Sequence, residues 1–281
     1  MRKKLSLVIA MSLTAVILFT ACASGSSSSS GSTKTAAGGT FKIGLECGYA
    51  PFNWTQNDAS NGGVKIDGSA DYAGGYDIEI AKKIAKDLGK QLVVVKTEWD
   101  GLVPALESGK IDAIIAGMSP TAKRKETIDF SDNYYKSDLV MVVKNGGKYV
   151  GATSIQDFTG AKVTAQLNTF HYSVIDQIKG VKKETAMDNF PAMRVALQSG
   201  IIDGYVSERP EGVSASTANK DFKMVEFKDG FVTSPDDTSI AVGIAKGSSL
   251  TASINKTLAS ISEQDRKSIM DTAIKNQPAA K

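Results

Sequence analysis

ALESGKID (residues 105–112) recurs without gaps as ALQSGIID (residues 196–203), and this repeat is the feature that decides the fold. Each copy has the pattern of a helix end, a glycine that stops the helix and the start of a buried strand. Both copies occur in the same order within a longer alternation of strand-like and helix-like segments. That order predicts two similarly built α/β lobes, each with a mainly parallel sheet and flanking helices.

The segments that follow the two repeats are the candidate site, because ligands of open α/β sheets bind outside the carboxyl ends of strands. AGMSPTAKR (residues 116–124) offers Gly117, Ser119 and Arg124, while Glu208 stands at the same position after the second repeat as Gly117 does after the first. A guanidinium beside backbone N–H groups suits a carboxylate. A buried carboxylate suits an ammonium group. A cleft with these two walls would bind a zwitterion.

Composition narrows the class of protein. The chain has 281 residues, 42% of them hydrophobic and 22% charged, which fits a globular protein with two modest domains. Its net charge is only +3 and its lysines are scattered, so no nucleic-acid partner is expected. His171 is the only histidine and has no evident metal-binding or catalytic partners. We therefore expect no metal, no cofactor and no catalytic residue, and we place His171 on an exposed helix face.

Residues 1–21 have the organisation of a signal peptide. Three basic residues precede the apolar segment 5–19, which is too short for a comfortable membrane span. The following FTAC (residues 19–22) resembles the lipobox of bacterial lipoproteins, which implies a lipid on Cys22. The Ser/Gly-rich remainder of residues 22–39 predicts a flexible linker. The domain would then be anchored to the outer face of the bacterial cytoplasmic membrane; an ordinary secretory signal is the alternative.

Four segments in order resemble the bacterial extracellular solute-binding proteins of family 3, which capture polar amino acids for ABC importers. They are GYAPF (48–52), GGYDIEIAKKIAKDLG (74–89), EWDGLVPALESGKIDAIIAGMSPTAKRKETIDFSDNYY (98–135) and IIDGYVSE (201–208). The resemblance extends from Phe41 to about Ala273 and implies a two-lobed, type II periplasmic-binding-protein-like fold with a hinged cleft. We expect residues 40–143 and 238–281 to form lobe 1 and residues 144–237 to form lobe 2.

The resemblance also implies which residues bind the main-chain groups of the ligand. Arg124 would bind the ligand's carboxylate, and Gly117 and Ser119 would add polar contacts from the same lobe. The turn Asn168-Thr169 would close onto the carboxylate from the second lobe. Glu208 would bind the ammonium group, in place of the family's usual aspartate.

Three further positions match those that surround the ligand's side chain in the family. Tyr49 and Trp99 would flank it, and Glu46 would lie near it. Aromatic faces favour a cation, and Glu46 adds an acceptor or a counter-charge, so we expect arginine, lysine or histidine. Glutamine or another polar amino acid is the alternative. The structural alternatives are that Tyr49 and Trp99 are ordinary core aromatics and that Glu46 is a turn residue without ligand contact.

These observations together predict the substrate-binding lipoprotein of an ABC importer rather than an enzyme. We expect a monomer that closes on a free L-amino acid and is then recognised by the permease subunits. A dehydratase-type enzyme or a ligand-binding sensor on the same fold are the alternative functions.

Overall fold

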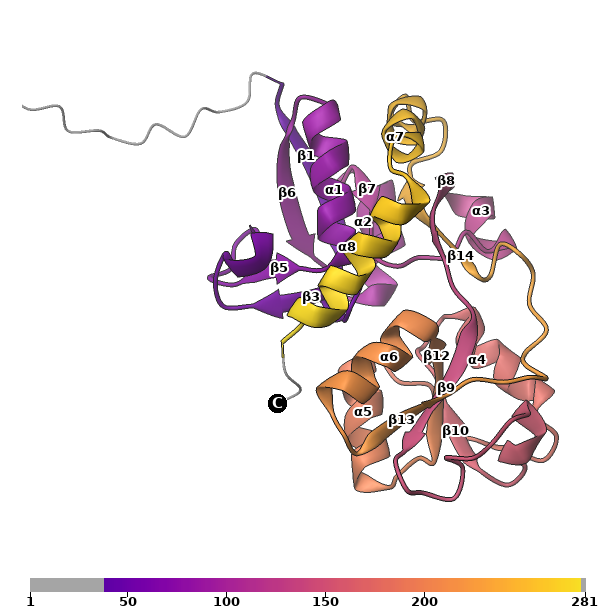
Figure 1. Ribbon diagram of the computed structural model, residues 1–281. Coiled ribbons are helices and arrows are strands. Elements are labelled where there is room, and N and C mark those ends of the chain that lie inside the picture. The colour runs from indigo at the N-terminus through magenta and orange to yellow at the C-terminus, as the bar shows by residue number, and fades with distance from the viewer. Residues whose placement is uncertain (1–37, 279–281) are drawn as a thin grey trace, which may run out of the picture. The chain divides into compact units, whose positions relative to one another are not determined.

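The computed structural model describes residues 38–278, so the expected signal peptide and Cys22 lie outside the described residues (Figure 1). Strands form two five-stranded sheets and one four-stranded sheet. The first sheet, in the order β6-β1-β7-β14-β8, consists of β1 (Thr40–Leu45), β6 (Gln91–Lys96), β7 (Ala113–Ile114), β8 (Asp129–Lys136) and β14 (Ser239–Ile244). The second, in the order β11-β10-β12-β9-β13, consists of β9 (Leu139–Lys144), β10 (Lys162–Thr164), β11 (Lys182–Lys183), β12 (Gly204–Glu208) and β13 (Phe222–Val225). The small sheet, β2-β3-β5-β4, consists of β2 (Gly48–Tyr49), β3 (Asn53–Gln56), β4 (Val64–Lys65) and β5 (Tyr72–Gly74).

The repeated segments at residues 105–112 and 196–203 are also a structural repeat. In the first copy, Asp112 follows the helix-stopping glycine and accepts a hydrogen bond from the Lys42 N–H at 2.8 Å. In the second copy, Asp203 accepts one from the Lys162 N–H at the same distance. Each aspartate thus ties its segment to the neighbouring parallel strand of its sheet. The expectation of two similarly built α/β lobes is confirmed.

Each large sheet is mixed rather than mainly parallel. In the first, β1 pairs in parallel with β6 and β7, whereas β14 runs antiparallel to β7 and β8. In the second, β10 pairs in parallel with β11 and β12, whereas β9 runs antiparallel to β12 and β13. The antiparallel strands are those next to the points where the chain passes from one sheet to the other.

This topology corrects the expected boundary at residue 143. Strand β9 (Leu139–Lys144) pairs with β12 and β13, so its residues belong to the second sheet. The apolar run of β9 reads as a continuation of the preceding strand, and only its pairing shows which sheet it joins. The first crossing lies at Ser137-Asp138, between β8 and β9, and the chain is back in the first sheet at β14, which begins at Ser239.

Helices cover the large sheets. They are α1 (Tyr76–Asp87), α2 (Leu102–Glu107), α3 (Ala122–Thr127), α4 (Phe170–Val174), α5 (Phe190–Ser199), α6 (Arg209–Ala218), α7 (Leu250–Ala259) and α8 (Glu263–Asn276), with short 3₁₀ turns η1 (Ser60–Gly62), η2 (Trp99–Gly101), η3 (Ile155–Phe158) and η4 (Ile175–Gln177). Helices α1, α7 and α8 gather beside the first sheet, and α5 and α6 pack on the second (Figure 1). Within residues 38–278, no helix is both long and apolar enough to cross a bilayer.

Local sequence explains the helices that position the site. On α1, Ile80, Ala81 and Ile84 share one face and are fully buried, as their spacing predicts. Helix α3 begins after Thr121, whose hydroxyl accepts a hydrogen bond from the Arg124 N–H. Helix α5 begins after Asn189, whose side chain accepts from the Ala192 N–H.

Candidate ligand-binding site

A small cavity lies where loops that follow strands of the first sheet meet loops that follow strands of the second. It is lined by Tyr49, Trp99, Gly117, Ser119, Arg124, Gln166, Thr169, Phe170, His171 and Phe190. The structure therefore brings together most residues that the sequence predicts for the site, whereas Glu46, Asn168 and Glu208 lie around the cavity without lining it. The cavity has a volume of about 10 Å³, room for about one water molecule.

Arg124 lies across the cavity. Its Nη1 donates to the Ser119 carbonyl at 2.9 Å and its Nη2 to the Asn168 carbonyl at 3.2 Å. The guanidinium carbon also lies 5.0 Å from the centre of the Trp99 ring, within range of a cation–π interaction. Burial lowers the pKa of Arg124 to about 10, and the negative charges of Glu208 and Asp237 oppose that shift. Arg124 therefore keeps its positive charge at neutral pH.

The two lysines beside Arg124 differ from it in position. Lys123 and Lys125 are exposed on α3, and Lys125 pairs with Asp236 at 2.7 Å outside the cavity. The basic cluster therefore contains one residue in the cavity and two on the surface.

Gly117 and Ser119 form the corner after β7, but their polar groups are engaged within the protein. The Gly117 N–H donates to the Tyr134 hydroxyl at 3.2 Å, so it is already paired and is not a free donor for a carboxylate. The Ser119 hydroxyl donates to the Asp237 carbonyl at 2.8 Å. Gly117 has a φ of +61°, and a Cβ there would lie 2.6 Å from the Tyr49 ring. Glycine is therefore required by both backbone conformation and close packing.

Glu208 is the last residue of β12 and is only 1% exposed. Its Oε2 accepts a hydrogen bond from the Tyr49 hydroxyl at 3.0 Å, and its Oε1 lies 3.4 Å from His171 Nε2. Burial, and then the negative charge of Glu208, raise the pKa of Tyr49 well above its ordinary value. Tyr49 therefore stays protonated and acts as a donor to Glu208.

Glu46 follows β1 and is also buried, at 5% exposed. Gln166, which follows β10, donates from Nε2 to Glu46 Oε2 at 3.0 Å and lies between Glu46 and the cavity. Burial raises the pKa of Glu46 to about 7, which the Gln166 hydrogen bond partly opposes. Glu46 is therefore a carboxyl group whose charge changes close to neutral pH.

The turn Asn168-Thr169, which follows β10 of the second sheet, is hydrogen-bonded to loops that follow strands of the first sheet. Asn168 has a φ of +55°, a conformation that asparagine tolerates better than most residues. Its side chain donates to Asp100 at 2.9 Å, and its carbonyl accepts from Arg124. The Thr169 hydroxyl donates to the Gln166 carbonyl at 2.6 Å, which shapes the turn.

The position of His171 differs from the one that its sequence predicts. It is 7% exposed and lines the cavity, rather than lying on an exposed helix face. Helix α4 is a short helix packed against β12, so a residue near its start faces inward. A lone histidine carries no periodic signal that would have revealed this.

Gln166, Phe170 and Phe190 also line the cavity, although they are not among the residues predicted for the site. Phe190 stacks on Tyr49 with ring centres 4.3 Å apart and planes at 5°. Gln166 stands just after β10, so the strand-end rule that found Glu208 could also have found it. Cys47 is buried beside this site, and burial raises the pKa of its thiol to about 12, as suits a packed cysteine.

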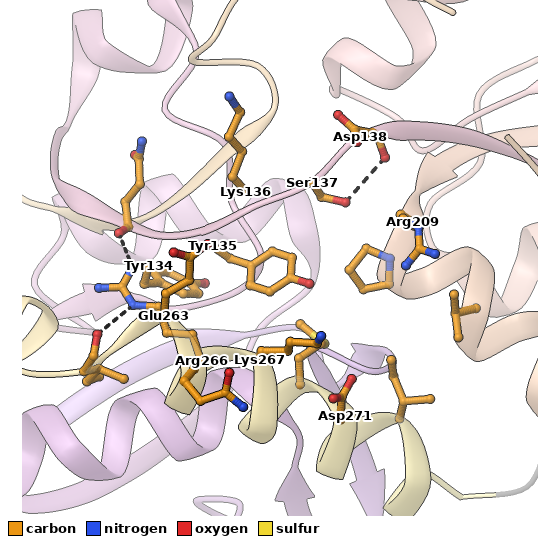
Figure 2. Close-up of a pocket in the computed structure, with 17 residues that line it drawn as sticks. Tyr134, Tyr135, Lys136, Ser137, Asp138, Arg209, Glu263, Arg266, Lys267 and Asp271 are labelled. Atoms are coloured by element: carbon orange, nitrogen blue, oxygen red, sulfur yellow. Dashed lines mark hydrogen bonds between the residues drawn. The ribbon is translucent and has the colours of Figure 1, made fainter. Parts of the chain in front are cut away.

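A larger groove of about 1240 Å³ lies elsewhere, beside the crossing at Ser137-Asp138 (Figure 2). The start of α6 and most of α8 border it, and its arginines have partners within the protein. Arg209 pairs with Glu226 at 2.7 Å, and Arg266 donates to the Asn133, Leu258 and Ile261 carbonyls. Charged side chains of both signs, Lys136, Lys267, Asp138, Glu263 and Asp271, also line this groove, which is far larger than the cavity beside Arg124.

Comparison with known proteins agrees with the geometry. The profile of the bacterial extracellular solute-binding proteins, family 3, matches residues 41–273. A probable histidine-binding protein of Campylobacter jejuni is 33% identical over 186 residues, which are 62% of this chain and 66% of that protein. The arginine-binding extracellular protein ArtP of Bacillus subtilis is 28% identical over 263 residues, 92% of each chain.

A solved structure is similar across most of the fold. It is the amino acid ABC transporter substrate-binding protein AbpA of Streptococcus pneumoniae, bound to L-arginine. It superposes with a TM-score of 0.71 and 26% identity, over 85% of this chain and 95% of that one. These proteins are solute-binding proteins rather than enzymes. With a two-lobed α/β fold and the family profile matched over residues 41–273, this chain belongs to the bacterial extracellular solute-binding proteins of family 3.

Proposed function

We propose that this protein binds one free amino acid between its two large sheets and delivers it to an ABC importer. The observation that carries the proposal is the pair of opposite charges from different sheets. Arg124 lines the cavity from the first sheet, and Glu208 lies behind Tyr49 and His171 at the end of a strand of the second. A guanidinium and a carboxylate so arranged suit the carboxylate and ammonium groups of one zwitterion.

Binding would require the two sides of the cavity to separate. The present space holds about one water molecule, because contacts cross it from both sides. These contacts are Arg124 to the Asn168 carbonyl, Tyr49 to Glu208, Glu46 to Gln166, Asn168 to Asp100 and the stack of Tyr49 on Phe190. A ligand carboxylate would replace the Asn168 carbonyl on Arg124. The crossings at Ser137-Asp138 and near Thr238 would be the hinge between lobes.

This mechanism implies that lobe 1 comprises residues from 40 to the first crossing together with 238–281, and that lobe 2 lies between the crossings. The ligand would bind first to the lobe carrying Arg124 and Trp99. Closure would then bring Glu208 and the turn Asn168-Thr169 onto it. The closed form would be the one that the permease subunits recognise, and the protein would act as a monomer.

We propose a basic amino acid, with arginine first, as the ligand. Trp99, Tyr49 and Phe190 line the cavity, and aromatic faces attract a guanidinium. The carboxylate of Glu46, which accepts a hydrogen bond from Gln166, would provide the counter-charge for the cationic side chain of the ligand. L-Arginine in the pneumococcal structure supports this ligand. Glutamine is the second candidate, since the amide of Gln166 can pair with another amide.

A thermal-shift screen with the twenty amino acids tests the proposal, because a ligand that binds only the folded protein raises its melting temperature. At least one amino acid, with arginine first, should shift it. Arg124→Ala should abolish that shift, and Lys123→Ala, an exposed cation one residue away, should preserve it. Absence of any shift would refute amino-acid binding. Equal losses in both variants would refute the role of Arg124.

We also propose that Cys22 is lipidated and holds the domain at the outer face of the membrane. The lipobox-like FTAC (residues 19–22) supports this. Cys22→Ala should release the protein from the membrane fraction of the native host and abolish labelling by a fatty acid. Retention of the variant with the membrane would refute the anchor.

Binding without chemical conversion is part of the proposal. Candidate amino acids incubated with the purified protein should be recovered unchanged, and turnover would support a dehydratase-type enzyme instead. Loss of uptake when the protein is deleted distinguishes transport from a purely sensory role.

A further inference from the structure

His171 carries an inference that the family resemblance does not supply. Its side chain is 8% exposed, and neither of its ring nitrogens has a hydrogen-bond partner among residues 38–278. Buried polar atoms in folded proteins are nearly always hydrogen-bonded, so an orphaned pair at a cavity wall points to a missing partner. The cavity that His171 lines is the one bordered by Arg124.

The neighbours of His171 indicate the chemistry of that partner. Its Nε2 lies 3.4 Å from Glu208 Oε1, and the other oxygen of Glu208 already accepts from the Tyr49 hydroxyl. The remaining acceptor of Glu208 and the imidazole nitrogen therefore lie side by side. Phe170 packs against the His171 ring, with ring centres 4.2 Å apart, and restricts its orientation. When the ring hydrogen is on Nδ1, Nε2 presents a lone pair beside Glu208 Oε1, and a cationic group with several N–H donors would satisfy both.

We propose that His171 is a ligand-binding residue that shares the ammonium group of the bound amino acid with Glu208, an inference that rests on the proposed function. An ammonium group has three donors. One reaches Glu208 Oε1 and a second reaches the lone pair of His171 Nε2. Arg124 would hold the carboxylate of the same ligand. His171 thus selects for ligands that carry a free α-amino group.

The experiment combines a substitution of His171 with the removal of the ammonium group from the ligand. Affinities of L-arginine and of its deamino analogue, 5-guanidinopentanoate, are measured by calorimetry at pH 8 for the wild type and His171→Phe. The phenylalanine keeps the ring but removes both nitrogens. L-Arginine should bind about 10- to 100-fold more weakly to the variant, the loss expected for a hydrogen bond to a charged group. The deamino analogue, which has no ammonium group, should bind the two proteins equally.

Two further variants separate binding from structure. His171→Gln offers an amide oxygen that can accept a hydrogen bond and should recover part of the lost affinity for L-arginine. Tyr172→Phe, on the same helix, removes a hydroxyl that donates to the Glu184 carbonyl outside the cavity and should leave both affinities unchanged. Melting temperatures identify any variant that fails to fold, in which case His171→Gln carries the comparison.

The outcomes are distinct. Equal losses for both ligands, no loss in His171→Phe, or tighter binding of L-arginine by that variant would each overturn the role of His171. Tighter binding would mean that His171 pairs with Glu208 as a cation and competes with the ammonium group. If the wild type binds no amino acid, the proposed function itself is refuted.

Discussion

Burial of Glu46 predicts that selectivity for a basic ligand depends on pH. The pKa of this carboxyl is raised to about 7, principally by desolvation. A ligand with a cationic side chain would bind best when Glu46 is ionised, whereas a neutral side chain such as that of glutamine has no such requirement. The perturbation is a change of pH from 8 to 5, applied to the wild type and to Glu46→Gln.

The size of the effect follows from the fraction of the protein in which Glu46 is ionised, the form that binds a cationic side chain. With a pKa of about 7, Glu46 is mostly ionised at pH 8 and about 1% ionised at pH 5. Apparent affinity falls in proportion to the competent fraction. L-Arginine should therefore bind up to about 100-fold more weakly at pH 5 than at pH 8, relative to L-glutamine.

The assay is the ratio of the two dissociation constants, measured by calorimetry at both pH values. The ratio cancels titrations that affect the ammonium and carboxylate groups, which both ligands share. Glu46→Gln should make the ratio independent of pH. Glu98→Gln, which removes an exposed carboxylate whose charge raises the pKa of Glu46, should retain most of the pH dependence.

The result can refute the reasoning in two ways. An arginine-to-glutamine ratio that is the same at pH 5 and pH 8 in the wild type would mean that Glu46 does not pair with the ligand. A pH-dependent ratio that persists in Glu46→Gln would assign the effect to another group.

The remaining predictions concern Gly117 after β7, the buried carboxyl group of Asp77 and the stack of Phe190 on Tyr49. Gly117→Ala should lower the unfolding free energy by about 1–3 kcal/mol and weaken ligand binding, because the left-handed backbone is strained and the new Cβ contacts Tyr49. Gly109→Ala, with a similar φ but open space around the Cβ, should lower stability by urea unfolding without changing affinity. Burial raises the pKa of Asp77 from 3.8 to about 7, so the folded state binds this proton more tightly than the unfolded state and the unfolding free energy falls as pH rises between these values. The unfolding free energy of Asp77→Asn should therefore rise relative to that of the wild type by up to about 4 kcal/mol between pH 4 and pH 8. A difference that does not depend on pH would contradict this prediction. Phe190→Leu should weaken arginine binding about fivefold, since the stack on Tyr49 is worth about 1 kcal/mol, and unchanged affinity would mean that the stack does not support the closed site.

Much of the site could be predicted from local sequence. The repeated segments locate the ends of β7 and β12, and Gly117 and Glu208 stand at equivalent places because both lobes are built alike. The separation of Arg124 from its lysine neighbours follows from the cap at Thr121, which sets the direction of each side chain on α3.

Other contacts depend on which segments meet in space. The pairing of β9 with the second sheet is a long-range event that its apolar sequence does not encode locally. Glu46 meets Gln166, and Tyr49 meets both Glu208 and Phe190, across more than a hundred residues of chain in each case. Such contacts determine the local dielectric, and therefore the raised pKa of Glu46.

The sequence by itself thus determined the family, the two α/β lobes and the cation that faces the cavity, because short repeats, caps and strand ends are local patterns. Only the tertiary structure decided that His171 is buried at the cavity wall beside Glu208. Burial of a single polar side chain depends on the packing of α4 against β12, and no periodicity in the chain records it.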